Sequence, residues 1–230
     1  MIDTQLLSIV YMQDCIEGMK KYDDKTFDLA IVDPPYGINR STIAGKQSGT
    51  QHGNAAAAKR HYAIKDWDKQ PPPHEYFKGL FRISKNQIIW GANHFISRMP
   101  YDASCWIVWD KDNGDNDFAD CELAWTSFDK AARKFKWTWS GMLQHDMKNK
   151  ERRIHPTQKP VALYEWLLHN YAKSGDLILD THLGSGSSRI AAYKNGFDFV
   201  GFEIDADYYA AQEKRFRTFI AQQGYQLGNF

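Results

Sequence analysis

The last third of the chain alternates between helical and strand-like patterns of hydrophobic residues. Apolar positions recur every three or four residues between 160 and 172, which predicts a helix that Pro160 opens. Strand, helix, strand and helix then follow in order, which predicts a βαβ unit with a parallel sheet. The expected strands are 177–179 and 197–202, and the expected helices are about 187–194 and from 205 or 206 to about 222.

The first two thirds carry shorter patterns. The apolar run at 27–32 predicts a buried strand, which ends where Pro34 and Pro35 prevent it from continuing. Residues 37–73 are rich in Gly, Ser, Asn and Pro, and so long an irregular segment is usually functional or disordered. Further strands are expected at 8–12, 87–90 and 105–109, helices at 15–22 and 74–84, and strands of a smaller sheet at 122–128 and 134–140.

The composition is that of one globular domain. Of 230 residues, 43% are hydrophobic and 25% are charged, which is ordinary for a folded protein with a large core. No apolar run reaches the roughly 18 residues of a membrane span, and residues 1–20 lack the basic leader of a signal peptide. The three cysteines favour a reducing cytoplasm over a disulfide framework, and cysteines and histidines lack zinc-site spacing, so no metal is expected.

The net charge of +1 is the sum of opposing blocks. Residues 1–38 and 102–122 each hold seven acidic residues, with three lysines in the first block and one in the second. Residues 40–66 hold five basic residues against one acid, and residues 130–159 hold nine against two. The basic blocks could line a phosphate backbone, or they could be ordinary solvated surface.

A glycine-rich loop and a later acid together predict a nucleoside site. Gly184 and Gly186 follow a strand and open a helix, so the backbone can turn tightly and present free N–H groups to a ligand. Glu203 closes the next strand, where a carboxylate can accept hydrogen bonds from ribose hydroxyls. The third glycine of a dinucleotide fingerprint is missing. A glycine turn followed by a helix-capping acid is the simpler alternative.

The tetrapeptide Asp33-Pro34-Pro35-Tyr36 presents acceptors at the end of a strand. Because proline has no N–H group, the turn offers the Asp33 carboxylate and the Pro34 carbonyl, a pair that suits an exocyclic amine. The ring of Tyr36 can stack on a planar base beside them. Taken alone, the tetrapeptide could also be a strand-ending turn with a core tyrosine.

Taken together, the tetrapeptide and the glycine loop resemble the S-adenosylmethionine-dependent amino-methyltransferases of DNA. The tetrapeptide precedes the loop, an order similar to that of the permuted beta group. The segment His155-Pro156-Thr157-Gln158-Lys159-Pro160 resembles the family segment beside the cofactor methionine. The resemblance implies an α/β Rossmann-like methyltransferase fold, with a mostly parallel twisted sheet, helices on both faces and an inserted target-recognition region. Within a single domain, it implies a catalytic part at 1–36, a central part with target recognition at 37–153 and a cofactor-binding part at 154–230.

The resemblance also implies which residues hold S-adenosylmethionine. The family loop usually reads Asp-Pro-Phe-x-Gly-Ser-Gly-Thr; this chain keeps its acid, both glycines and the serine between them, and replaces Pro-Phe by Thr181-His182. Asp14 is compatible with both adenine contact and a helix N-cap. The implied set is Asp14, Cys15, Thr157, Gln158, Lys159, Asp180, His182, Gly184, Ser185, Gly186, Ser187, Glu203 and Asp205.

By the same resemblance, Asp33, Pro34, Pro35 and Tyr36 carry methyl transfer to the N6 amine of adenine in double-stranded DNA, with the base flipped out of the helix. Asp33 favours adenine, and N4 of cytosine is the nearest alternative. An RNA or free-nucleotide methyltransferase, or an inactive DNA-binding relative, are further alternatives. A homodimer and a partner restriction nuclease, in a bacterium or a phage-infected host, stay open. The expected DNA-binding residues are Arg40, Lys46, Lys59, Arg60, Lys134, Lys136, Lys148, Lys150, Arg152 and Arg153.

Overall fold

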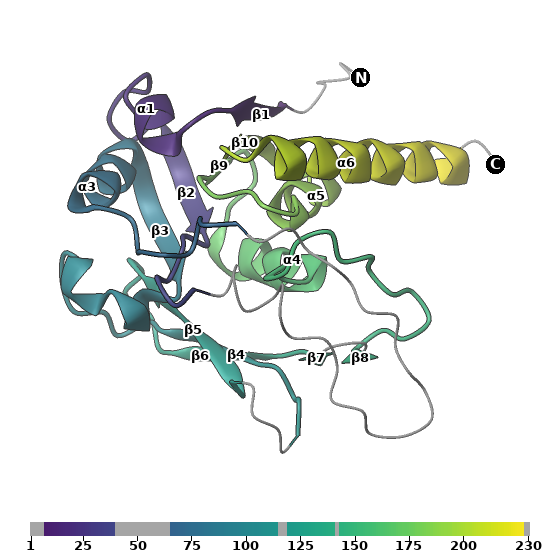
Figure 1. Ribbon diagram of the computed structural model, residues 1–230, viewed down its shortest axis with the longest axis horizontal. Helices are drawn as coiled ribbons and strands as arrows, with labels where there is room; N and C mark the ends of the chain where they lie inside the picture. The colour runs from purple at the N-terminus through teal and green to yellow at the C-terminus, as the bar shows by residue number, and fades with distance from the viewer. Residues whose placement is uncertain (1–6, 40–64, 115–118, 141–142, 228–230) are drawn as a thin grey trace.

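An eight-stranded sheet with the order β1-β10-β9-β2-β3-β5-β4-β6 forms the centre of the protein (Figure 1). The structure is a computed structural model, and it describes residues 7–39, 65–114, 119–140 and 143–227. The strands of this sheet are β1 (Ser8–Met12), β2 (Phe27–Val32), β3 (Ser84–Trp90), β4 (Ile107–Asp110), β5 (Cys121–Thr126), β6 (Arg133–Lys136), β9 (Leu177–Asp180) and β10 (Asp198–Glu203).

Five neighbouring strands, from β1 to β3 in the sheet order, run parallel. The parallel sheet expected from the strand–helix alternation is therefore confirmed. β9 and β10 are the last two strands along the sequence, yet in the sheet they lie between β1 and β2. The N-terminal and C-terminal parts of the chain thus share one sheet, which is how the tetrapeptide and the glycine loop come together.

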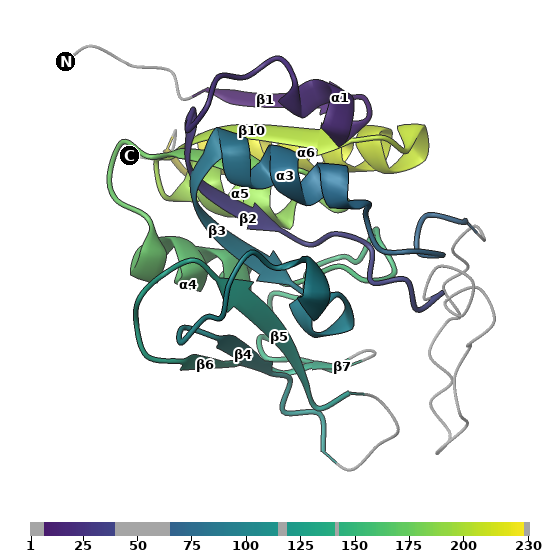
Figure 2. The same ribbon diagram turned by 90° about the vertical axis from the view of Figure 1, so that its left-hand side faces the viewer.

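Helices cover both faces of the sheet (Figures 1 and 2). Along β2, Leu29 and Ile31 belong to one hydrophobic cluster, and Ala30 and Val32 belong to the other. This alternation follows from the two-residue repeat of a strand. On the first face lie α4 (Val161–Tyr171), α5 (Ser187–Lys194) and α6 (Ala206–Leu227), and on the second lie α1 (Cys15–Met19) and α3 (His74–Ile83).

The prediction of a separate smaller sheet at 122–128 and 134–140 is wrong. β5 pairs antiparallel with β3 and β4, and β6 pairs parallel with β4, so both strands extend the main sheet. The reason is burial: Ala124 and Trp125 of β5 are fully buried, and Trp125 packs edge-on against Phe81 of α3. Among the described residues, two short strands pair apart from the main sheet, antiparallel to each other: β7 (Trp139–Ser140), which is the end of the strand expected at 134–140, and β8 (Leu143–Gln144).

Two helix ends also differ from the expected positions. α1 stops at Met19 rather than at about residue 22, and the chain continues in a tighter turn, in which the Lys21 and Tyr22 amides donate to the carbonyls of Gly18 and Met19. The Arg82 guanidinium caps this end by donating to the carbonyl oxygens of Met19 and Tyr22. α6 continues to Leu227, five residues beyond the expected end at about 222. In the described part of the chain, no helix is both long and apolar enough to cross a membrane.

Candidate active site

The acids singled out in the sequence gather at the carboxyl ends of β2, β9 and β10. Asp33 follows β2, Asp180 ends β9 and Glu203 ends β10. β2 and β9 are neighbours, but the chain leaves β2 toward α3 on one face and leaves β9 toward α5 on the other. Such a reversal opens a crevice at the strand ends, which is the usual ligand site of a doubly wound sheet.

The tetrapeptide is held in place from both its backbone and its ring. The amides of Tyr36 and Gly37 donate to the same carboxylate oxygen of the buried Asp68, at 2.8 and 3.0 Å. The Tyr36 ring stacks on the exposed ring of His94, with centroids 5.1 Å apart. Position 91 must be glycine, since its φ is +69° and a Cβ there would lie 2.0 Å from the Tyr36 ring. Tyr36 is therefore fixed beside Asp33.

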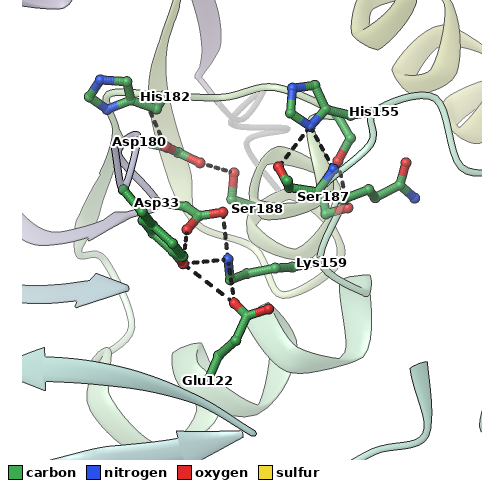
Figure 3. A network of polar contacts seen from close by, with 12 residues as sticks. Asp33, Glu122, His155, Lys159, Asp180, His182, Ser187 and Ser188 are labelled. Atoms are coloured by element: carbon green, nitrogen blue, oxygen red, sulfur yellow. Dashed lines mark hydrogen bonds and ion pairs between the residues drawn. The ribbon is translucent and has the colours of Figure 1, made fainter. Parts of the chain in front are cut away.

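A row of alternating charges runs from Asp33 through Lys159 and Glu122 to Lys111, and Figure 3 shows the first three of these residues. The Lys159 ammonium lies 2.5 Å from Asp33 Oδ2 and 3.0 Å from Glu122 Oε2. Glu122 Oε1 lies 2.6 Å from the Lys111 ammonium. The Lys159 side chain is only 3% exposed, so its pairs are well shielded from water.

Burial and ion pairing together determine the protonation of these charged side chains. Although burial disfavours its charged form, Lys159 and Lys111 lower the pKa of Glu122 to about 2. Burial likewise opposes the ammonium form of Lys159, but Asp33 and Glu122 raise its pKa. Burial and the neighbouring Glu122 raise the pKa of Asp33, and the Lys159 ammonium opposes that rise. The charge of Asp33 therefore depends on Lys159.

The arrangement presents hydrogen-bond acceptors in a fixed geometry. Asp33 Oδ1 accepts from the Tyr36 hydroxyl at 2.7 Å, and Oδ2 accepts from Lys159, which leaves each oxygen with acceptor capacity. No described residue donates to the Pro34 carbonyl oxygen. An exocyclic amine has two N–H groups and finds two acceptors here. The site can therefore orient an amine without forming a covalent bond to it.

The glycine-rich loop is shaped by the Glu203 carboxylate. Gly184 and Gly186 have φ of +52° and +72°, which favours glycine at both positions. The Gly184 amide donates to Glu203 Oε2 at 2.7 Å, and the Asp205 amide donates to Oε1 at 2.8 Å. Burial raises the pKa of Glu203, and these two backbone donors oppose the rise. Glu203 thus fixes the turn and keeps lone pairs for hydroxyl donors.

Asp180 and His182 lie at the start of this loop, where Asp180 also contacts Ser188 (Figure 3). Asp180 accepts from the His182 amide at 3.0 Å and from the Ser188 hydroxyl at 2.5 Å, and burial raises its pKa to about 7. Burial lowers the pKa of His182 to about 4, so its buried ring is neutral near pH 7. The ring packs edge-on against Tyr76, 5.1 Å between centroids. The neutral His182 imidazole therefore packs against Tyr76 at the place in the loop where the family sequence usually has phenylalanine.

Asp14 and Cys15 lie beside His182 at the start of α1. Asp14 is the N-cap of this helix, because its carboxylate accepts from the amides of Ile16 and Glu17. The Cys15 sulfur lies 3.9 Å from His182 Nε2. Burial, followed by the charge of Asp14, raises the pKa of Cys15 to about 12, so this cysteine is a thiol and not a nucleophilic thiolate.

His155 packs over the glycine loop from the other side. Its ring lies 3.6 Å from the position of a Cβ on Gly184, and it contacts the rings of Trp67 and Tyr208. Its Nδ1 contacts the Thr157 hydroxyl at 3.1 Å, and burial lowers the pKa of His155 to about 3. Gln158 is buried, and its Oε1 accepts from the Ile154 amide. Near pH 7 the side chains of His155, Thr157 and Gln158 are therefore all uncharged.

The other expected cofactor residues have structural partners. The Asp205 carboxylate pairs with Lys65 at 2.5 Å and accepts from the amides of Asp207 and Tyr208, as the cap of α6. The hydroxyls of Ser185 and Ser187 contact each other at 3.1 Å. Arg215 donates to the Ser185 carbonyl and the Ser187 hydroxyl. Lys159 lies with Asp33 and Glu122, not with the glycine loop (Figure 3).

The expected DNA-binding residues fall into three groups. Arg40, Lys46, Lys59 and Arg60 lie outside the described residues. Lys134 and Lys136 on β6 pair with Asp110 and Asp112, and Arg153 stacks on the Trp139 ring at 4.3 Å. Lys148, Lys150 and Arg152 are exposed and form no ion pair with any described residue. This last group presents exposed positive charge, although Lys148 also interacts with the Asp146 carboxylate, whose pKa is lowered by Asn149 and by Lys148.

Comparison with known proteins supplies the family. A family profile described as DNA methylase matches residues 83–214, more than half of the chain. This chain belongs to the DNA methylase family. The methyltransferase is 23% identical to the Type II methyltransferase M2.MboI of Moraxella bovis, over 90% of this chain and 86% of that protein.

Solved structures of DNA methyltransferases share the fold. The crystal structure of the M1.HpyAVI–SAM complex covers 90% of this chain and 98% of its own, at 22% identity and a TM-score of 0.52. The cytosine-N4-specific PvuII DNA methyltransferase matches at 12% identity and a TM-score of 0.58, with 90% and 85% covered. The Rossmann-like α/β methyltransferase fold is therefore confirmed, and the methyltransferase uses S-adenosylmethionine and acts on amino groups of DNA.

The residues around the glycine loop fit this cofactor. Glu203 has acceptor capacity left for the two hydroxyls of a ribose, and the loop glycines lack the side chains that would crowd it. The Trp67 ring, beside His155, carries a buried indole N–H with no hydrogen-bond partner among the described residues. A buried donor of this kind is normally satisfied, and a bound ligand can supply the acceptor.

Sequence patterns missed several residues of this site. Glu122, Lys111, Asp68 and His94 all contact the tetrapeptide or its partners, from segments far along the chain. Glu122 was visible only as one of seven acids in the block 102–122. The available signal was its place in a strand beside Trp125, where an ionised side chain needs a partner.

Proposed function

We propose that this methyltransferase transfers a methyl group to the N6 amine of adenine in double-stranded DNA. The observation that carries the proposal is the Asp33 carboxylate next to Tyr36, at the end of β2 and beside the cofactor loop of β9. The resemblance noted above associates Asp in this tetrapeptide with adenine. N4 of cytosine is the alternative, and a cytosine-N4-specific enzyme shares the fold.

Asp33 and the Pro34 carbonyl would receive the two N–H groups of the target amine. The adenine lone pair is delocalised into the ring, so acceptors that hold the amine out of the ring plane make it a better nucleophile. S-adenosylmethionine would supply an activated methyl group. Asp33 would accept the proton that the amine loses when its new N–C bond forms and the methyl–sulfur bond breaks.

Tyr36 would hold the flipped base by stacking. A base inside a duplex cannot reach the crevice, so it must leave the helix at a cost of a few kcal/mol. The exposed His94 ring already stacks on one face of Tyr36, with centroids 5.1 Å apart, so a flipped base would take the place of this ring. Pro35 keeps the turn rigid between Asp33 and Tyr36.

On the cofactor side, Glu203 would bind the ribose hydroxyls, with Asp205 next to it. The loop around the cofactor would be formed by Asp180, Gly184, Ser185, Gly186 and Ser187. Asp14, Cys15 and His182 would border the adenine, while Thr157 and Gln158 would border the amino acid end. Since Type II methyltransferases are among its relatives, we place the chain in restriction–modification.

Transfer of tritium from labelled S-adenosylmethionine to duplex DNA, followed by nucleoside analysis, tests the proposal. The expected product is labelled N6-methyladenosine in deoxy form. Labelled N4-methylcytosine would overturn the choice of base, and label found in RNA but not in DNA would overturn the substrate. No transfer from the wild-type chain to any of these would remove the proposed activity.

Lys148 and Lys150 would contact DNA phosphates. Replacing both by alanine should lower the slope of log affinity against log salt concentration by about 2, because each phosphate contact contributes about 0.9. The matched control is the Lys134→Ala, Lys136→Ala double variant, whose lysines already pair with Asp110 and Asp112. An equal loss of slope in both double variants would contradict this assignment. Fluorescence anisotropy with a labelled duplex, repeated at several salt concentrations, measures the slope for each double variant.

A further inference from the structure

The Lys159 ammonium is saturated with hydrogen-bond acceptors from the protein. It lies 2.5 Å from Asp33 Oδ2, 3.0 Å from Glu122 Oε2 and 3.2 Å from the Tyr36 hydroxyl oxygen. A lysine ammonium has three N–H donors and no acceptor. Three partners therefore use its whole capacity, and none is left for the carboxylate of a cofactor.

We propose that Lys159 is a positioning residue for methyl transfer, which holds the Asp33 carboxylate charged and aimed at the target amine. The proposal rests on the proposed function of Asp33 as the acceptor of that amine. It assigns to Lys159 a role at the catalytic tetrapeptide in place of contact with the cofactor. Glu122 is the second positioning residue, because it binds the same Lys159 ammonium that pairs with Asp33.

Charge is the reason that Asp33 needs such a partner. A protonated carboxyl group donates a hydrogen bond with one of its oxygens, whereas binding an N–H group requires acceptors. Two carboxylates that are buried close to each other tend to share a proton, because neighbouring like charges disfavour ionisation. The ammonium between Asp33 and Glu122 counters this repulsion, and Lys111 neutralises the far side of Glu122.

The other groups that face Asp33 are acids or neutral. They are the Tyr36 hydroxyl, Glu122 of β5, Asp180 of β9, Tyr164 of α4 and Tyr76 of α3. Among the described residues, Lys159 is the one cation in contact with Asp33. The ionisation of Asp33 should therefore respond to Lys159 and to Glu122 in opposite directions.

Two substitutions test this prediction through the pH dependence of single-turnover methylation at saturating cofactor and DNA. In Lys159→Met the rate should fall at least about 100-fold, the size of effect of an electrostatic group at a reacting centre. The acid limb of its pH profile should move to higher pH, because Asp33 loses its counter-charge. Lys159→Arg should restore part of the rate and of the profile.

Glu122→Gln should move the acid limb the other way, to lower pH, because it removes the negative charge beside Asp33. This variant keeps Lys159 in place, so it remains informative if Lys159→Met does not fold. The affinity for S-adenosylmethionine, measured by calorimetry, should stay within about threefold of wild type in both, since neither side chain contacts the glycine loop.

Three results would overturn the inference. One is a weakened cofactor affinity in Lys159→Met with a normal rate at saturation, which would make Lys159 a cofactor ligand. Another is a slower Lys159→Met with an unmoved acid limb and no rescue by arginine, which would make its role merely structural. The third is an acid limb in Glu122→Gln that stays or moves to higher pH. A wild-type chain that transfers no methyl group would instead refute the proposed function.

Discussion

The two sides of the crevice stabilise buried carboxylates in different ways. On the catalytic side, Asp33 and Glu122 pair with the ammonium groups of Lys159 and Lys111. On the cofactor side, Asp180 and Glu203 accept from backbone amides and, for Asp180, from a serine hydroxyl. Opposite charges thus stabilise Asp33 and Glu122, whereas Asp180 and Glu203 are positioned mainly by hydrogen bonds from the backbone. The catalytic side should therefore respond to changes of charge, and the cofactor side to changes of geometry.

The largest effect is expected at the catalytic side. Asp33→Ala and Tyr36→Ala should each reduce methyl transfer by at least about 100-fold, because one removes the acceptor and the other removes the stacking ring. Tyr36→Phe should lose less, since it keeps the ring. Asp24→Asn, an exposed acid that pairs with Arg82, is the control. Full activity in either alanine variant would remove the catalytic assignment.

At the cofactor side, the effect should appear in binding and not in the chemical step. Glu203→Gln should weaken S-adenosylmethionine about tenfold, because a charged acceptor gives way to a neutral one. The rate at saturating cofactor should change less than about threefold. Asp198→Asn, at the exposed start of the same strand, should leave the affinity unchanged. Calorimetry and single-turnover kinetics separate the two quantities, and a slower rate with normal affinity would erase the contrast.

The smallest expected effect concerns the pH dependence of stability. Burial raises the pKa of Asp180 to about 7, above its value in the unfolded chain, so the folded state binds this proton more tightly. Its contribution to stability is therefore lost as the pH rises from about 4 to about 7. Asp180→Asn lacks this loss, so its Tm relative to wild type should rise by about 5 °C between pH 5 and 7 and then level off.

Thermal unfolding by circular dichroism at several pH values measures this difference. Asp176→Asn is the matched control, because Asp176 is an exposed acid just before the same strand, and its difference from wild type should be flat. A falling difference for Asp180→Asn would mean that Asp180 is stabilised as an anion, as the acids of the catalytic side are.

The predictability of the two sides from sequence follows the same division. The cofactor side could be predicted because neighbouring residues determine its turn. Gly184 and Gly186 adopt positive φ, and Glu203 ends the next strand. The tetrapeptide was visible for the same reason. The partners of Asp33 could not be found this way, since Lys159 and Glu122 meet it only when three distant segments fold.

The strand assignment shows a similar limit. Strand periodicity located β5 and β6, but not the sheet that they join, because pairing depends on which face of a neighbour is left to bury. Trp125 settles it by packing against Phe81 of α3. The end of α1 was missed because its last carbonyls are capped by Arg82, a side chain of α3 that lies far along the sequence.

The strand order also has a consequence for synthesis on the ribosome. Among the described strands, β1 pairs with β10 and with no other, and the Leu7 amide donates to the Asp198 carboxylate across 191 positions of sequence. At translation rates of about 5–20 residues per second, β1 waits about 10–40 s for this neighbour. During that time β2 and β3 can pair, but both β1 and one edge of β2 stay open. The strands that bring the cofactor loop are thus also the ones that close the sheet, so a nascent chain is exposed to aggregation until the site itself can form.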